Sequence, residues 1–181
     1  SKMTVIRVLC VAFIELFRSV PLITILFMAT TMFPLFLPEG FHINKLASAI
    51  VAVCLFAAAY MAEVVRGGLQ AIPKGQYEAA EAVGLTYWQS MGFIVMPQAL
   101  KYMIPNIVSN FMGLFKDTTL VSIIGLYDLL GMINAVSQDP SWIGLHHEPL
   151  FTAAVIFFIG CFAMSKYSQY LERNLGAGHG R

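Results

Sequence analysis

Long uncharged segments alternate with short charged ones along this chain. The uncharged segments cover residues 19–38, 46–62, 102–115, 118–127 and 150–165. A helix of about 20 residues is about 30 Å long, which matches the hydrocarbon core of a bilayer. Lys116 and Asp117 separate the third segment from the fourth, so we interpret these two as one helix interrupted at depth. The pattern predicts an all-α integral membrane protein with four spans.

The composition supports this class. Of the 181 residues, 58% are hydrophobic and 12% are charged, whereas a soluble domain has about 25% charged residues. So little charge does not cover a water-exposed surface, which excludes an ordinary soluble domain.

We expect no signal peptide, because no short apolar region with a small-residue cleavage site is visible. Three cysteines, Cys10, Cys54 and Cys161, lie far apart in apolar sequence, and we predict buried thiols there rather than disulfides or metal ligands.

Lysine and arginine are distributed unevenly between the two predicted sides of the membrane. Four crossings put both termini and the central loop on one side. That side carries Lys2, Arg7, Arg18, Arg66, Lys74, Lys101, Lys166, Arg173 and Arg181. The opposite side carries Lys45, so the positive-inside rule makes the termini and the central loop cytoplasmic. We therefore divide the chain into an interfacial segment (1–18), a membrane domain (19–172) and a flexible cytoplasmic tail (173–181).

The central loop, residues 73–97, is the longest stretch that does not fit in lipid. Residues 76–83 are rich in Ala and Glu and predict a helix, which Gly84 ends in a left-handed conformation. Thr86 and Gln89 have the spacing of a capping box that opens a second helix. Pro97 is expected to limit that second helix. On these local signals alone, an ordinary helical hairpin is an equally good interpretation.

The spacing inside this loop resembles a known motif. Glu78-Ala79-Ala80, then Gly84, then Ile94 and Met96-Pro97 resemble the EAA loop of ABC importer permeases, with Met96 in place of the usual Leu. In that family the loop forms a coupling helix that docks in a groove of the ATP-binding subunit. The resemblance implies that the ATPase-coupling residues are Gln76, Glu78, Ala79, Ala80, Glu81, Gly84 and Pro97.

The flanking segments resemble one branch of that family. Residues 15–22, 59–68, 75–80, 97–99 and 116–120 are similar to segments of polar amino acid uptake permeases, above all the general L-amino acid type. The resemblance implies a MetI-like fold, which usually has five spans with the N-terminus outside, so a first span is expected to be missing here. It implies an ATP-binding subunit, a second permease subunit (identical or homologous), an extracytoplasmic amino-acid-binding protein and membrane lipid as partners. No nucleic acid partner, no cofactor and no ATP hydrolysis by this chain are expected, since no phosphate-binding glycine loop is present.

Charges inside the apolar region suggest a second site. A charge at the bilayer centre costs at least ~3 kcal/mol, so such groups usually face a cavity or a partner. We predict that Lys116 lies near a substrate carboxylate, and the family resemblance implies that Lys116, Asp117, Thr118 and Thr119 line the substrate pathway. The alternative is that Lys116 and Asp117 lie at the outer interface or satisfy the ends of a broken helix.

Other polar residues receive structural interpretations. Glu63 and Arg66 are three apart and predict an ion pair at the inner interface. Residues 146–148, His-His-Glu, do not predict a metal site, because adjacent side chains do not face one way, and a loop facing a binding protein fits them better. Trp142, Tyr167 and Tyr170 are candidate interfacial anchors.

Two other functions remain open at this point. One is a permease of the same fold for another solute, such as methionine or an oxyanion. The other is a membrane scaffold or channel that does not depend on an ATPase.

Overall fold

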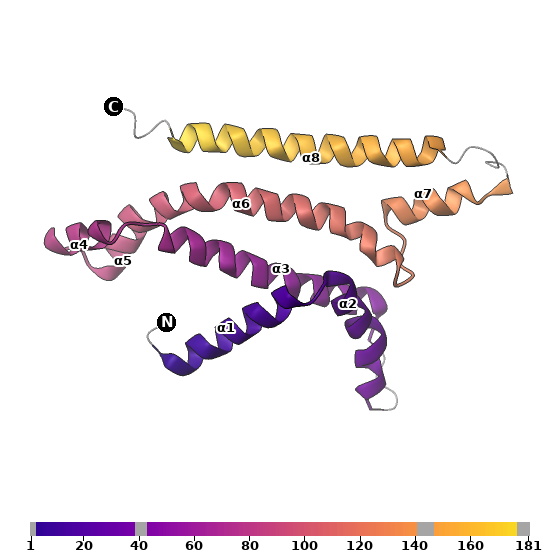
Figure 1. Ribbon diagram of the computed structural model, residues 1–181, viewed down its shortest axis with the longest axis horizontal. Coiled ribbons are helices and arrows are strands. Elements are labelled where there is room, and N and C mark those ends of the chain that lie inside the picture. Colours follow the sequence, from indigo (N-terminus) through magenta and orange to yellow (C-terminus); the bar gives the residue numbers. More distant parts are fainter. Residues whose placement is uncertain (1–2, 39–42, 141–146, 177–181) are drawn as a thin grey trace. The chain divides into compact units, whose positions relative to one another are not determined.

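The computed structural model describes residues 3–38, 43–140 and 147–176, and every regular element in those ranges is helical (Figure 1). The all-α prediction is therefore confirmed. The longer helices are α1 (Thr4–Ser19), α3 (Lys45–Gln70), α4 (Lys74–Ala82), α6 (Met96–Asp117), α7 (Leu129–Ser137) and α8 (His147–Gly176). The short elements are α2 (Leu22–Phe27), α5 (Tyr87–Ser90), π turns at Met28–Met32 and Met91–Val95, and 3₁₀ turns at Phe33–Phe36 and Thr118–Ser122.

The chain divides into two compact units. The first unit contains Ser1–Tyr60 and Gly113–Cys161, and the second contains Met61–Met112 and Phe162–Arg181. The boundaries fall inside α3, α6 and α8, so each of these helices contributes one part to each unit.

Two helices in the described part of the chain, α3 and α8, are long and apolar enough to cross a membrane. A third crossing is added if α1 and the stretch Leu22–Phe36 count as one span, although they meet at an angle of 101°. The span predicted over 19–38 is therefore wrong at its start, because Ser19 ends α1. The physical reason is Pro21, which has no N–H and pushes Val20 into an extended conformation, with φ −106° and ψ 132°.

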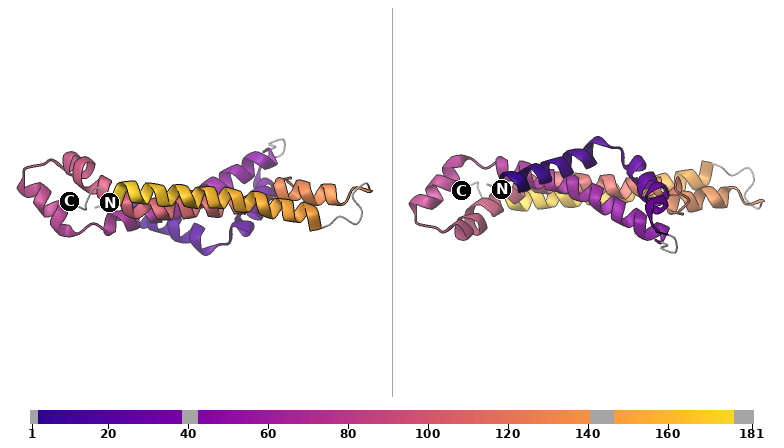
Figure 2. Two further views of the ribbon diagram at one scale, coloured as in Figure 1. Left: turned by 90° about the horizontal axis from the view of Figure 1, so that it is seen from above. Right: turned by 90° about the horizontal axis from the view of Figure 1, so that it is seen from below.

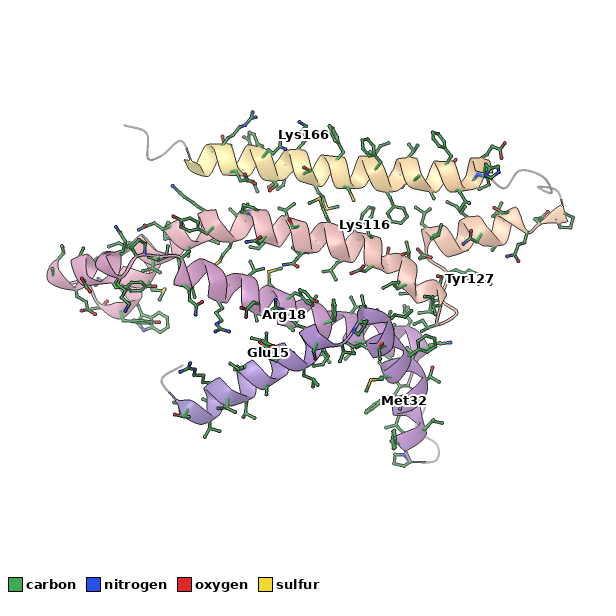
Figure 3. All side chains as sticks on the ribbon, in the orientation of Figure 1. Glu15, Arg18, Met32, Lys116, Tyr127 and Lys166 are labelled. Atoms are coloured by element: carbon green, nitrogen blue, oxygen red, sulfur yellow. The ribbon has the colours of Figure 1, made fainter. Side chains whose placement is uncertain are left out.

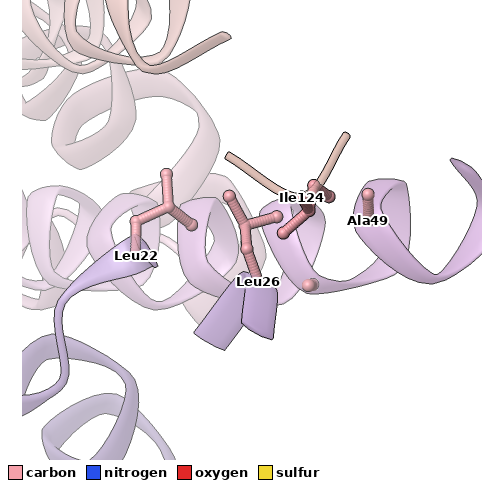
Figure 4. Close-up of a cluster of buried hydrophobic side chains, with 5 residues drawn as sticks. Leu22, Leu26, Ala49 and Ile124 are labelled. Carbon is pink, nitrogen blue, oxygen red and sulfur yellow. The ribbon is translucent and has the colours of Figure 1, made fainter. Parts of the chain in front are cut away.

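The first unit is held by a cluster of small and branched side chains (Figure 4). Its buried members are Leu22, Leu26, Ala49, Ala52 and Ile124. The alanines of α3 let the backbone of α2 approach closely, and Leu26 is 0% exposed. Ile124 brings the turn after α6 into the same core, so the cluster joins segments far apart in the sequence.

The second unit has a core of its own, formed by Ile72, Val95, Ala99 and Met103. Gly68 allows α3 and α6 to approach here, since a Cβ on Gly68 would lie 2.3 Å from Cγ of Met103. Tyr77 of α4 packs against the same cluster. The core therefore ties the central loop to the two helices from which it projects.

Much of the remaining apolar surface is exposed in this single chain. Side chains stand out along α1 and α8 (Figure 3), where Leu9, Phe151 and Phe158 are each more than 60% exposed. Cys10 and Cys54 are also exposed, and all three cysteines are free thiols. The prediction of buried thiols is therefore wrong for those two, because they lie on helix faces left for lipid or another subunit.

Helix α8 is longer than the predicted span over 150–165. It continues to Gly176, so residues 173–176 of the predicted flexible tail are helical. Residues 177–181 lie outside the described residues, as do Lys2, Trp142 and His146. Tyr167 and Tyr170, the other candidate anchors, are each 60% exposed on α8.

Candidate functional site

Helices α4 and α5 fold together in the loop between α3 and α6 (Figure 2). Helix α4 ends as predicted at Gly84, which has φ +80°. The N–H of Leu85 donates to the carbonyl of Ala80 at 3.1 Å, and the N–H of Gly84 donates to that of Glu81 at 2.9 Å. These two bonds are a Schellman motif, which satisfies helix-end carbonyls and requires a left-handed residue. The predicted helix, glycine turn and second helix are confirmed.

The second helix opens with the predicted capping pair. Gln89 Oε1 accepts from the backbone N–H of Thr86 at 3.0 Å and from its hydroxyl at 2.9 Å. Pro97 does not end this helix, which is a correction: α5 passes through the π turn Met91–Val95 directly into α6. The N–H of Met96 donates to the carbonyl of Met91, five residues back. This wider turn accommodates a proline ring that would clash with the carbonyl four residues back in a regular α-helix.

The predicted coupling residues divide between two faces of α4. Glu78, Ala79 and Glu81 are exposed. Ala80 is 1% exposed and cannot touch a partner directly, so its predicted docking contact is wrong. Gln76 is half-buried and bonded within the chain, to Gln98 of α6. A partner would therefore contact the glutamates, while Gln76 and Ala80 seat the helix.

Four apolar residues in the loop were not predicted as site residues, although they are its most exposed large side chains. Val83 is 79% exposed, Tyr87 66%, Trp88 80% and Phe93 76%. The rings of Tyr87 and Trp88 meet edge to face, with centroids 5.3 Å apart. Exposed Trp and Tyr beside a polar helix are typical of binding hot spots. The signal was available in the sequence, as aromatic residues in a segment too polar for lipid.

The predicted ion pair lies on α3 just before the loop. Nη1 of Arg66 is 3.5 Å from Oε2 of Glu63, and both side chains are partly exposed. An exposed pair of this kind contributes little to stability. The predicted pairing is present, and its structural role stays a prediction.

At the other predicted site, α6 ends at the charged pair. Lys116 is exposed (Figure 3) and Asp117 is half-buried. The hydroxyl of Thr118 donates to the carbonyl of Phe115 at 2.8 Å, and that of Thr119 donates to the carbonyl of Lys116 at 2.9 Å. Both hydroxyl protons therefore satisfy helix-end carbonyls, and each oxygen keeps only its acceptor capacity for a ligand.

The segment after this break differs from the prediction. Instead of a helix over 118–127, a 3₁₀ turn leads to Gly125, which has φ +77°. Helix α7, which was not predicted, then begins after Asp128, whose carboxylate accepts from the N–H of Gly131 at 2.8 Å. The break is real, but it is followed by a turn and a new helix rather than by the same helix resumed.

The described residues contain no group of three or more His, Cys, Asp or Glu side chains placed to hold a metal ion. Of the His-His-Glu sequence, His147 and Glu148 lie in the first turn of α8.

Comparison with known proteins gives the family. The family model described as "binding-protein-dependent transport system inner membrane component" matches residues 2–176. The inner membrane amino-acid ABC transporter permease protein YhdY of Escherichia coli is 54% identical over 98% of this chain and 48% of its own length. The glutamate/glutamine/aspartate/asparagine transport system permease protein BztC of Rhodobacter capsulatus is 53% identical over 99% of this chain and 42% of its own length. This chain thus spans under half the length of both relatives.

A solved structure agrees with this assignment. It is described as the crystal structure of an amino acid ABC transporter with histidines, and it superposes with a TM-score of 0.84 at 29% identity over 96% of this chain and 78% of that one. Inward-facing structures of the MetNI methionine ABC transporter, at 24% identity, share the fold. The predicted MetI-like fold is confirmed. With its EAA motif on an exposed loop, this chain belongs to the family of binding-protein-dependent transport system inner membrane components.

Proposed function

We propose that this chain forms a permease subunit of an ATP-driven importer that moves amino acids into the cell, of the broad polar or general L-amino acid type. One observation carries the proposal. The EAA segment forms a capped helix that presents Glu78 and Glu81 outward, beside the exposed aromatic pair Tyr87 and Trp88. A surface with aromatic anchors and acidic neighbours is suited to docking a partner with a basic groove.

The partner in this proposal is a separate ATP-binding subunit. ATP binding closes two such subunits, and their movement displaces α4 and α5 and switches the spans between inward-open and outward-open states. ATP acts in this way only if it favours one conformer through differential contact, and the loop is where that contact is made. A second permease subunit completes the pathway, and an extracytoplasmic binding protein delivers the substrate.

The topology of the proposal follows the charge count. The loop and the described ends of the chain face the cytoplasm, where Arg66, Lys74 and Lys101 lie. Residues 1–18 are an interfacial segment, and the sharp bend after α1 supports this assignment. The segment 19–172 is the membrane domain.

The cargo is assigned to amino acids by the relatives named above and by the flanking motifs. Lys116 lies in the last turn of α6, directly after the apolar residues Leu114 and Phe115, and it is exposed. It is suited to bind the α-carboxylate that all amino acids share. Asp117, Thr118 and Thr119 complete the pathway on the same turn.

The test is copurification and uptake. The tagged chain is expressed with an ATP-binding subunit and a second permease of an amino acid importer, and is reconstituted in vesicles with an amino-acid-binding protein. We expect the ATPase to copurify and labelled L-glutamine to accumulate with ATP, in competition with other L-amino acids. If the vesicles took up only methionine or only an oxyanion, the cargo would be another solute. If the chain retained no ATPase, the proposed importer function itself would be contradicted.

A further inference from the structure

We propose that Gln98 is a positioning residue that links the coupling helix α4 to the spanning helix α6, so that displacement of α4 moves α6. The inference rests on the proposed function, because the ATPase supplies the displacement. Docking of the ATPase does not by itself define how the displacement travels through this chain, and the Gln98 link supplies that route.

The link is a single amide group. Nε2 of Gln98 donates to Oε1 of Gln76 at 3.0 Å and to the carbonyl of Ile94 at 2.9 Å. Gln76 belongs to α4, Ile94 to the π turn, and Gln98 to α6. A side-chain amide has two protons to donate, and both are used. One nitrogen thus joins three elements, across a separation of 22 residues in the case of Gln76.

The link lies beside the buried core of the second unit. Val95, at the end of the π turn, and Ala99, the residue after Gln98 on α6, are each 0% exposed, and both belong to the core of the second unit. Tyr77, next to Gln76, packs against the same core. Both glutamines are half-buried. A polar group in such a place is costly to leave without a partner, so the bond is expected to persist as the helices move.

Gln98 directly follows Pro97, and this neighbour gives the side-chain bond of Gln98 a role. Pro97 supplies no N–H at the start of α6, so the backbone ladder is weakest at the point where α6 meets the loop. The side chain of Gln98 adds a bond to the carbonyl of Ile94 across this gap. The side chain of Gln98 therefore supplements the backbone hydrogen bonds that join the start of α6 to the loop.

Helix α4 has two faces that fit this role. Glu78, Ala79 and Glu81 face outward, where a partner can push. Gln76 and the buried Ala80 face inward. A displacement received on the outer face is passed by Gln76 to Gln98, and so to the first turn of α6.

The experiment compares Gln98→Leu, Gln76→Leu and the double variant in the reconstituted transporter, with Gln70→Leu as the matched control, since Gln70 is exposed at the end of α3. The readouts are ATPase copurification, ATP hydrolysis and uptake of labelled L-glutamine. We expect each single variant to keep its ATPase and its hydrolysis while uptake falls about tenfold, the size expected when a half-buried polar group loses its mate. The double variant should be no worse than either single one, because both remove the same bond.

Unchanged uptake in Gln98→Leu, or losses that multiply in the double variant, would overturn the inference. If leucine at 98 prevents assembly, Gln76→Lys/Gln98→Glu decides: an ion pair should give higher uptake than Gln76→Leu/Gln98→Glu, and equal uptake in the two would also overturn the link. A wild-type chain that retains no ATPase would instead contradict the proposed function, so the two failures are distinguishable.

Discussion

The central loop and the break after α6 use one backbone device in two different settings. At the loop, the N–H of Leu85 reaches the carbonyl of Ala80; at the break, the N–H of Leu126 reaches that of Val121 at 3.1 Å. Each turn has a left-handed glycine, Gly84 or Gly125. A capping residue then opens the next helix, Thr86 with Gln89 at the loop and Asp128 at the break.

The settings differ in what surrounds the turn. The loop leaves Val83 and Trp88 exposed. The break is packed from within, since Ile124 belongs to the core of the first unit and Leu126 packs against it. Similar local geometry therefore serves the proposed docking surface in one place and, in the other, a corner that packs Ile124 into a core while Tyr127 stays 74% exposed. The side chains that flank the turn, rather than the turn itself, therefore decide the function of each region.

The largest effect is expected at the break. Lys116→Met removes the cation proposed to bind the substrate carboxylate, so uptake of L-glutamine should fall to the level of vesicles without transporter while ATPase copurification is unchanged. Lys116→Arg keeps the charge and should retain part of the activity. Lys166→Met is the control, because Lys166 is an exposed lysine on α8 whose ammonium lies 5.4 Å from the Phe162 ring. Normal uptake in Lys116→Met would mean that the break does not bind the substrate carboxylate and serves only as a structural corner.

The next effect is expected at the loop. Trp88→Ala removes the proposed anchor and should weaken ATPase binding about 30-fold, the loss of about 2 kcal/mol typical of a hot spot. Titration of the ATP-binding subunit onto the detergent-solubilised chain measures the dissociation constant. Tyr170→Ala, at an aromatic residue 60% exposed on α8, should leave it unchanged. Equal affinities for all three proteins would move the docking surface away from the aromatic pair.

The loop was more predictable than the break because its signals are local. Gly84 and the pair Thr86 and Gln89 stand in polar sequence, where a turn and a cap are the natural interpretation. Gly125 and Asp128 lie at the end of an apolar run, and reading that run for span length concealed the turn. Asp128 before two leucines had the pattern of an N-cap and would have predicted α7.

Other features depended on partners distant in sequence. A nine-residue helix rich in Ala and Glu does not reveal which face is buried, so the sequence assigns Ala80 to docking although it is 1% exposed. Gln98 lies 22 residues from Gln76, and their hydrogen bond has no sequence pattern. The sequence predicts a helix end at Pro97, because the π turn that accommodates this proline is not visible in the composition.

The two glycines offer a matched test of moderate size. Gly84→Ala and Gly125→Ala each force a Cβ into a left-handed conformation at a cost of about 1–2 kcal/mol. Thermal unfolding in detergent should show a lower midpoint for both. Gly84→Ala should also weaken ATPase binding, whereas Gly125→Ala should lower uptake without that effect. Gly75→Ala is the control, since a Cβ there meets nothing within 4 Å. The same pattern of functional losses in both variants would contradict the separation of the two regions.

The smallest effect concerns the caps. Asp128→Ala removes a half-buried carboxylate that accepts from Gly131, and we expect a loss of about 1 kcal/mol. Gln89→Ala removes two bonds to Thr86, but these are exposed and water replaces them, so about 0.5 kcal/mol is expected. Asp128→Asn keeps an accepting oxygen and should cost less than Asp128→Ala. Midpoints of thermal unfolding rank the three variants. A larger loss of stability for Gln89→Ala than for Asp128→Ala would contradict this ranking. Burial would then not govern the strength of the two caps, and the loop would depend on its cap more than the break does.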